Sequence, residues 1–212
     1  MKTNYQKWVL NRIKIFGERM GFFKCSSEVL KNDCLTIESA QQVIDTALKY
    51  GQIGGIFHLG LVLEDILIEK MNYEQFKQTV DCKFRVFNYM DKLTRKLNYE
   101  LDYFVIFSSL ACGIGNRGQT NYGYGNSMCE HICEQRRRDG LHGLAIQYGP
   151  IGDVGLFENI SQTVEISSVQ KQRINSCCAV LDKLLAKDQP VITSWVSIVS
   201  DANGPLTSLL DS

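Results

Sequence analysis

The side chains best placed to do chemistry lie in one segment, SSLACGIGNRGQTNYGYGN, from position 108 to 126. Ser109 precedes Tyr122 by 13 positions, and Asn126 follows Tyr122 by one helical turn. A phenol ordinarily has a pKa near 10, so it exchanges a proton readily at neutral pH only where a nearby cation favours the phenolate. These residue types could do chemistry, since a phenol can exchange a proton and a hydroxyl can hold a polar group by a hydrogen bond.

Taken one at a time, such residues also have ordinary structural interpretations. Tyr122 would be an aromatic residue at a helix start, Ser109 a strand-end hydroxyl, and Lys83 part of a solvated helix face. His58 would be a satisfied core histidine. Only their joint spacing favours a site.

Three glycines in the same segment satisfy G-x-G-x-x-G, a pattern that can hold a pyrophosphate where a strand turns into a helix. They are Gly113, Gly115 and Gly118. The loop is too long for the tight turn of that motif, and position 139, about 20 residues on, does not end a second strand. We interpret the three glycines as loop residues.

Strands and helices alternate along the chain. Apolar periodicity predicts helices over 37–50, 73–97, 121–138 and 169–186, and strands over 54–60, 101–109, 141–149 and 191–198. This order predicts an α/β fold, a Rossmann-like doubly wound parallel sheet with helices on both faces. Ligands of such sheets bind beyond the carboxyl ends of the strands, where His58 and Gly60, Ser109, and the stretch GPIGDVG at 149–155 should face one crevice.

Composition excludes several classes of partner. The chain has 212 residues, with 23 Lys plus Arg against 23 Asp plus Glu, so no net charge favours nucleic acid or an anionic membrane. Neither a signal peptide nor an apolar run of about 20 residues is present, and we expect a cytoplasmic protein. The run Arg136–Arg138 predicts a solvated helix end.

The eight cysteines fall mostly inside predicted strands and helices, which predicts reduced thiols rather than a disulfide scaffold. Cys129, His131 and Cys133 do not predict a metal site, because a helix would turn the histidine away from the two thiols.

The 108–126 segment resembles the short-chain dehydrogenase/reductase superfamily. Within it, the resemblance is to the ketoreductase domains of fatty acid and polyketide synthases, whose motif reads S-S-x-x-x-x-x-G-N-x-G-Q-x-N-Y-x-x-x-N. The stretches ELDYFVIFSS, ICEQRRRDG and YGPIGDVG are especially similar to the animal fatty acid synthase. The match is strongest over 33–155, so we expect a partial ketoreductase domain over 1–200 and a polar tail over 201–212.

The resemblance implies catalytic roles for four residues. Tyr122 would donate a proton to the substrate carbonyl that Ser109 orients, and Lys83, in DCKF, would lower the pKa of Tyr122. Asn126 would hold Lys83 or an ordered water. Asp65, in VLEDIL, matches an Asp that accompanies a 3R-hydroxy product in related ketoreductases.

The resemblance also implies NADPH as cofactor. His58 and Gly60 would line its ribose, Asp33 would meet the adenine, and the backbone around Pro150 and Ile151 would receive the nicotinamide amide. The implied substrate is a 3-oxoacyl thioester on an acyl carrier protein, and the implied partners are other fatty acid synthase domains.

The sequence departs from the family at its start. No stretch like TGGxGGxG precedes Tyr5, so we expect the first βαβ unit with its glycine-rich turn to be missing and the sheet to be incomplete. Two hypotheses stay open: a 3-oxoacyl carrier-protein reductase, or the part of one that bears its active site; and a catalytically silent remnant with at most a structural or interaction role. Retention of the four catalytic residues favours the first, and the missing turn favours the second.

Overall fold

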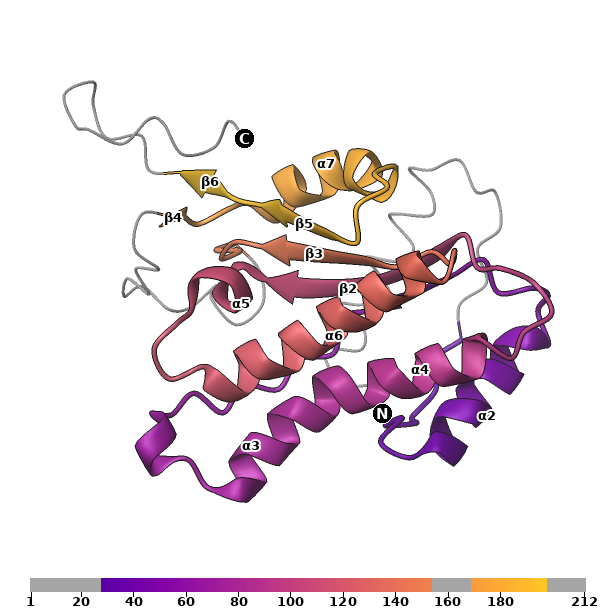
Figure 1. The fold of residues 1–212 in the computed structure, drawn as a ribbon, viewed down its shortest axis with the longest axis horizontal. Helices are drawn as coiled ribbons and strands as arrows, with labels where there is room; N and C mark the ends of the chain where they lie inside the picture. The colour runs from indigo at the N-terminus through magenta and orange to yellow at the C-terminus, as the bar shows by residue number, and fades with distance from the viewer. Residues whose placement is uncertain (1–27, 154–168, 198–212) are drawn as a thin grey trace. The chain divides into compact units, whose positions relative to one another are not determined.

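The computed structural model describes residues 28–153 and 169–197 (Figure 1). The chain divides into two units, 1–32 and 33–212, and the elements below belong to the second. The predicted tail over 201–212 and the last two residues of GPIGDVG lie outside the described residues. In the described part, no helix has the length and apolar character needed to cross a membrane.

Four parallel strands form the central sheet, in the order β1-β2-β3-β5. They are β1 (Gly55–His58), β2 (Tyr103–Ser109), β3 (Leu144–Tyr148) and β5 (Val191–Ser194). All five residues of β3 are buried, as expected for an inner parallel strand covered on both faces. The parallel order confirms the predicted α/β fold class.

Alternate residues of β2 face two separate layers of helices. Phe104 and Ile106 pack in the cluster that contains α2 (Ile37–Leu48), α4 (Val86–Thr94) and α6 (Thr120–Arg138). Val105 packs in a second cluster with Cys177 of α7 (Ile174–Leu185). Helices therefore cover both faces of the sheet, which confirms the doubly wound arrangement.

The helix predicted over 73–97 forms in three parts. α3 (Tyr73–Val80) begins with a capping box between Asn72 and Gln75, is followed by a π-helical turn, η2 (Asp81–Arg85), and continues as α4. A π turn inserts an extra residue and changes which side chains face inward, and it occurs often at functional sites. Lys83 lies in the middle of this turn.

Two predicted boundaries were wrong near the carboxyl end. The strand predicted over 191–198 breaks into β5 and β6 (Val196–Ser197), and β6 pairs antiparallel with β4 (Val169–Gln170). Because residues 169–170 are taken up by that pairing, α7 begins only at Ile174. By contrast, α6 ends at Asp139-Gly140 as predicted, with Gly140 at φ 78°. The short elements η1 (Ile68–Lys70) and α5 (Leu110–Ile114) were not predicted.

Candidate active site

Ser109 and Tyr122 meet at the carboxyl end of β2. Ser109 is the last residue of β2 and the N-cap of α5, where its Oγ accepts a hydrogen bond from the backbone N–H of Ala111 at 3.2 Å. Tyr122 lies in the first turn of α6, and its side chain hydrogen-bonds with that of Ser109. The two residues that the motif spacing singled out are therefore in contact.

Lys83 reaches the same place from the π turn. Its side chain is only 2% exposed, and Nζ donates a hydrogen bond to the carbonyl of Phe107 at 2.8 Å. Nζ lies 5.7 Å from the centroid of the Tyr122 ring. Burial lowers the pKa of Lys83 to about 8, because the charged form is poorly solvated there. The solvated-face interpretation of Lys83 was wrong.

Burial governs the pKa of the phenol. It raises the pKa of Tyr122, and hydrogen bonds with the side chains of Asn126 and Ser109 oppose that rise. The effect of Lys83, whose Nζ lies 5.7 Å from the ring centroid, on the pKa of Tyr122 stays a prediction.

Asn126 supports the start of α6 and offers a free acceptor. Its side chain is fully buried, and Nδ2 donates to the carbonyl of Tyr122 at 2.9 Å. Oδ1 is buried and has no hydrogen-bond partner among the described residues. A buried acceptor without a donor costs about 1–3 kcal/mol, so this atom marks a place that suits a polar ligand atom or a water.

Asp65 is bound to the loop that precedes α6. Its Oδ2 accepts from Nε2 of Gln119 at 2.9 Å, and the N–H of Ile66 donates to the carbonyl of Gly118 at 2.9 Å. Gly118 has φ 85°, a conformation that favours glycine, so it acts in a loop as interpreted from the sequence. The same interpretation was wrong for Gly113, which lies inside α5.

Asn121 is a site residue that sequence reasoning missed. It is fully buried, and its Nδ2 donates to the carbonyl of Glu64 at 3.0 Å and to Oγ1 of Thr79 at 3.1 Å. Asn121 directly precedes Tyr122, so its bond to Thr79 fixes the start of α6 against α3. The signal was its place in the motif Q-x-N-Y.

The first pair of proposed cofactor residues lies against the π turn. Nε2 of His58 donates to the carbonyl of Cys82 at 3.1 Å, and burial together with the nearby Lys83 lowers the pKa of His58 to about 4. A Cβ at Gly60 would lie 2.8 Å from Cε1 of His58 and 3.1 Å from the Cys82 carbonyl. Only glycine fits at that position without a shift.

The other proposed cofactor residues lie in two further places. The carbonyl of Pro150 accepts from the N–H of Gln172 at 2.7 Å, and Ile151 forms a parallel bridge with Gln172, so this loop is held at the end of β3. Asp33 lies before α2, where its Oδ1 accepts from the N–H of Leu35 at 3.0 Å. The contacts found for Asp33 are local to that helix start.

Comparison with known proteins decides the family. Residues 17–153 match the family model of the KR domain. The chain belongs to the KR family.

Relatives of this KR chain include the hybrid PKS-NRPS synthetase thnA of Trichoderma harzianum, 34% identical over 145 residues, and the highly reducing polyketide synthase calA of Penicillium decumbens, 33% identical over 138 residues. The alignments cover 68% and 65% of this chain but 4% and 5% of those proteins. The KR chain therefore spans a small fraction of the synthases it matches.

Solved structures share its fold. A ketoreductase domain from the bacillaene assembly line superposes with a TM-score of 0.76 at 17% identity, covering 92% of this chain and 47% of that one. PlmKR1, the ketoreductase from the first module of phoslactomycin biosynthesis in Streptomyces sp. HK803, gives 0.75 at 18% identity, with 85% and 42% covered. Their likeness confirms the Rossmann-like fold.

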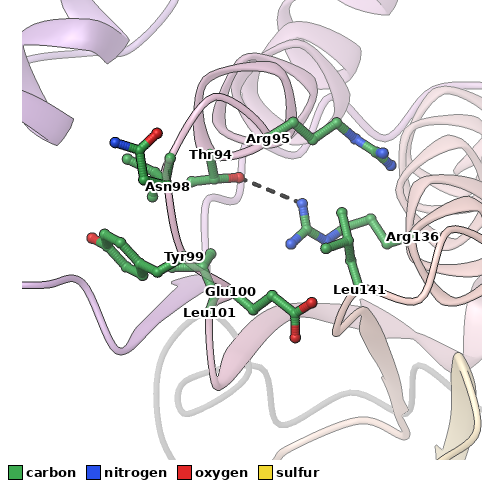
Figure 2. Close-up of a pocket in the computed structure, with 9 residues that line it drawn as sticks. Thr94, Arg95, Asn98, Tyr99, Glu100, Leu101, Arg136 and Leu141 are labelled. Atoms are coloured by element: carbon green, nitrogen blue, oxygen red, sulfur yellow. Dashed lines mark hydrogen bonds between the residues drawn. The ribbon is translucent and has the colours of Figure 1, made fainter.

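A pocket elsewhere in the KR chain is separate from this site. A hollow of about 220 Å³ lies at the amino ends of the strands, where Leu101 precedes β2 and Leu141 precedes β3 (Figure 2). Arg136 reaches into its wall and donates to Oγ1 of Thr94 at 3.4 Å. The catalytic candidates lie at the opposite, carboxyl end of β2.

Arg136 corrects one expectation. It is 2% exposed and pairs with Asp91 at 2.8 Å, so the first arginine of the run Arg136–Arg138 is part of the interior rather than a solvated helix end. Its partner neutralises the buried charge, which is the condition for burying an arginine at all.

Proposed function

We propose that this chain bears the active site of a β-ketoacyl reductase, which reduces a 3-oxoacyl thioester to the 3-hydroxyacyl thioester with NADPH. The observation that carries the proposal is the convergence of Ser109, Tyr122 and Lys83 from β2, α6 and the π turn. A hydroxyl, a phenol and a buried amine within mutual reach suit the protonation of a carbonyl oxygen.

In this scheme the bound cofactor supplies a hydride to the carbonyl carbon. Tyr122 gives its proton to the oxygen on which negative charge develops, and Ser109 donates a hydrogen bond to the same oxygen. Lys83, held on the Phe107 carbonyl, stabilises the phenolate that Tyr122 leaves. The free Oδ1 of Asn126 accepts from a donor that connects the buried amine to solvent.

The residues around the strand ends fit a nicotinamide cofactor. His58 is kept neutral at the end of β1, and Gly60 lets this strand end pack closely against the π turn that carries Lys83. Pro150 and Ile151 form a backbone-lined loop at the end of β3, which suits an amide group. Asp33 is proposed for the adenine, on the resemblance alone.

The biosynthetic setting is proposed from the sequence. ELDYFVIFSS, ICEQRRRDG and YGPIGDVG favour a fatty acid synthase, with acyl carrier protein and the other synthase domains as partners in the cytoplasm. The relatives named above are polyketide synthases. Both settings present a β-keto thioester to the same residues, and we propose that Asp65 favours the 3R-hydroxy product.

The test compares the chain with two tyrosine variants. NADPH is titrated into the purified chain, and its oxidation is followed after addition of a 3-oxoacyl thioester. We expect Tyr122→Phe to lower kcat by about 100-fold or more, since the proton donor is gone. Tyr124→Phe, at a side chain 47% exposed two residues away, should act like the wild type. A folded wild-type chain that neither binds NADPH nor turns over would contradict the proposal and leave the silent remnant.

A further inference from the structure

Glu130 lies on the same face of α6 as the catalytic candidates. Tyr122, Asn126 and Glu130 are spaced by four residues each, so their side chains follow one another along one side of the helix. Nothing in the proposed reaction uses Glu130, although its side chain is half-buried beneath the site.

Its carboxylate accepts hydrogen bonds from three separate elements. Oε1 accepts from Oγ of Ser108 at 2.5 Å and from Nε2 of Gln147 at 2.9 Å. Oε2 accepts from Sγ of Cys112 at 3.4 Å. The donors lie near the carboxyl end of β2, near the end of β3 and in α5.

The connection extends to a third strand. Oε1 of Gln147 accepts from Oγ1 of Thr193 in β5 at 2.9 Å. A single side chain of α6 therefore links the ends of three adjacent strands, directly or through Gln147.

The chemistry of the cluster suits an ionised carboxylate. All three direct contacts are donors, and ionised groups make the stronger hydrogen bonds. Within the described ranges, Glu130 has no ion pair with a lysine or arginine. These donors therefore compensate the partial burial of its charge.

We propose that Glu130 is a positioning residue of the reductase, which holds the carboxyl ends of β2 and β3 and the start of α5 on the helix that carries Tyr122. Ser109 follows Ser108 directly, so the bond from Ser108 to Glu130 sets the distance between Ser109 and Tyr122. The inference rests on the proposed function. Displacements of about 1 Å at an active site cost about 100-fold in rate.

The first test is Glu130→Gln, with Glu134→Gln as the matched control. The amide keeps the shape but has one acceptor oxygen where the carboxylate has two, so the cluster loses an acceptor. We expect kcat to fall about 10- to 100-fold with little change in the KM for the thioester. Glu134 lies one turn further along α6 and pairs with Arg138 at 3.6 Å, so its variant should keep wild-type kcat.

The second readout does not depend on activity. Burial and the nearby Glu130 raise the pKa of the Cys112 thiol to about 12. Glu130→Gln should lower that pKa, and alkylation of Cys112 by iodoacetamide, measured by peptide mass spectrometry, should become faster. Glu134→Gln should leave the rate unchanged.

The outcomes separate the two proposals. Wild-type kcat in folded Glu130→Gln, or an unchanged Cys112 rate, overturns the positioning role. A wild-type chain without turnover contradicts the proposed function instead. In that case only the alkylation rate of Cys112 tests the role of Glu130. If circular dichroism shows that Glu130→Gln does not fold, Ser108→Ala removes one donor and is expected to lower kcat with unchanged KM; wild-type kcat there overturns the inference.

Discussion

At the scale of single residues, burial rather than charge pairing sets the chemistry of this site. Lys83 is surrounded by protein, its amine is held by one carbonyl, and its pKa falls to about 8. Tyr122 is affected in the opposite sense, since burial also disfavours the phenolate and raises its pKa. The two shifts move the pKa values of the amine and the phenol further apart. The ammonium that we propose to stabilise the phenolate therefore loses its proton more easily than a solvated lysine.

The lowered pKa of Lys83 predicts a pH-dependent stability. Between the unfolded pKa of 10.5 and the folded value of about 8, the unfolded chain binds a proton that the folded chain does not. Stability is therefore lost as the pH falls through this window, and the loss is complete below about pH 8. Lys83→Met removes the titrating group. The free energy of unfolding of the variant minus that of the wild type should therefore be about 2–3 kcal/mol larger near pH 7 than near pH 10.

Urea unfolding of both chains at the two pH values measures this difference. Loss of the hydrogen bond to Phe107 is independent of pH and cancels in the comparison. If the difference in free energy of unfolding between Lys83→Met and the wild type is the same at both pH values, Lys83 is not buried in the folded chain.

At the scale of elements, the close approach of α6 to the π turn brings Lys83 and Tyr122 together. Gly125 of α6 faces Lys83, and a Cβ there would lie 3.3 Å from Cβ of Lys83 and 3.6 Å from Cα of Val80. Gly123, half a turn earlier, has room for a Cβ, which would lie 4.0 Å from the Ala111 carbonyl, an ordinary contact. The position of Lys83 therefore depends on the contact between α6 and the π turn.

This contact makes Gly125→Val a sharp probe. We expect it to lower the free energy of unfolding by about 1–3 kcal/mol, since the added methyl groups force the helices apart. The kcat should fall by more than the loss of folded protein accounts for, because Lys83 moves when the π turn shifts.

Gly123→Ala is the matched control for that contact. It should raise stability by about 0.5–1 kcal/mol, since alanine favours a helix and nothing obstructs its Cβ. Thermal melting with kcat for each folded variant measures both effects, and equal melting temperatures for the two variants would contradict the close contact.

At the scale of the whole molecule, the order of strands leaves β1 at one side of the described sheet. Among the described strands, β1 pairs only with β2. Phe57 of β1 is 43% exposed and contacts the ring of Tyr103, so an apolar surface lies beside backbone groups with which no other described strand pairs. Such an edge tends to pair with another chain.

We therefore expect the chain to self-associate through β1, and Phe57→Lys to reduce that association. A charge on an edge strand disfavours edge-to-edge pairing at small cost to the fold. Sedimentation velocity at increasing concentration measures the change. Tyr50→Lys, at a residue 70% exposed outside the sheet, is the control. Equal association in both variants would place the contact elsewhere.

The sequence by itself determined the alternation of strands and helices, the doubly wound class, and the segment that carries Ser109, Tyr122 and Asn126. These follow from local patterns, since apolar periodicity and motif spacing depend on neighbours in the chain. The buried pair of Arg136 and Asp91 was missed, because a run of three arginines carries no sign of which one turns inward.

Tertiary structure alone decided the environment of the residues proposed to be catalytic. The π turn, the carbonyl of Phe107 that holds Lys83, and the raised pKa of Tyr122 depend on groups distant in sequence. The role inferred for Glu130 arises in the same way, since its donors come from two strands and a short helix. Solvation and hydrogen bonding of a side chain are set by what the fold packs around it, and the chain order does not contain that information locally.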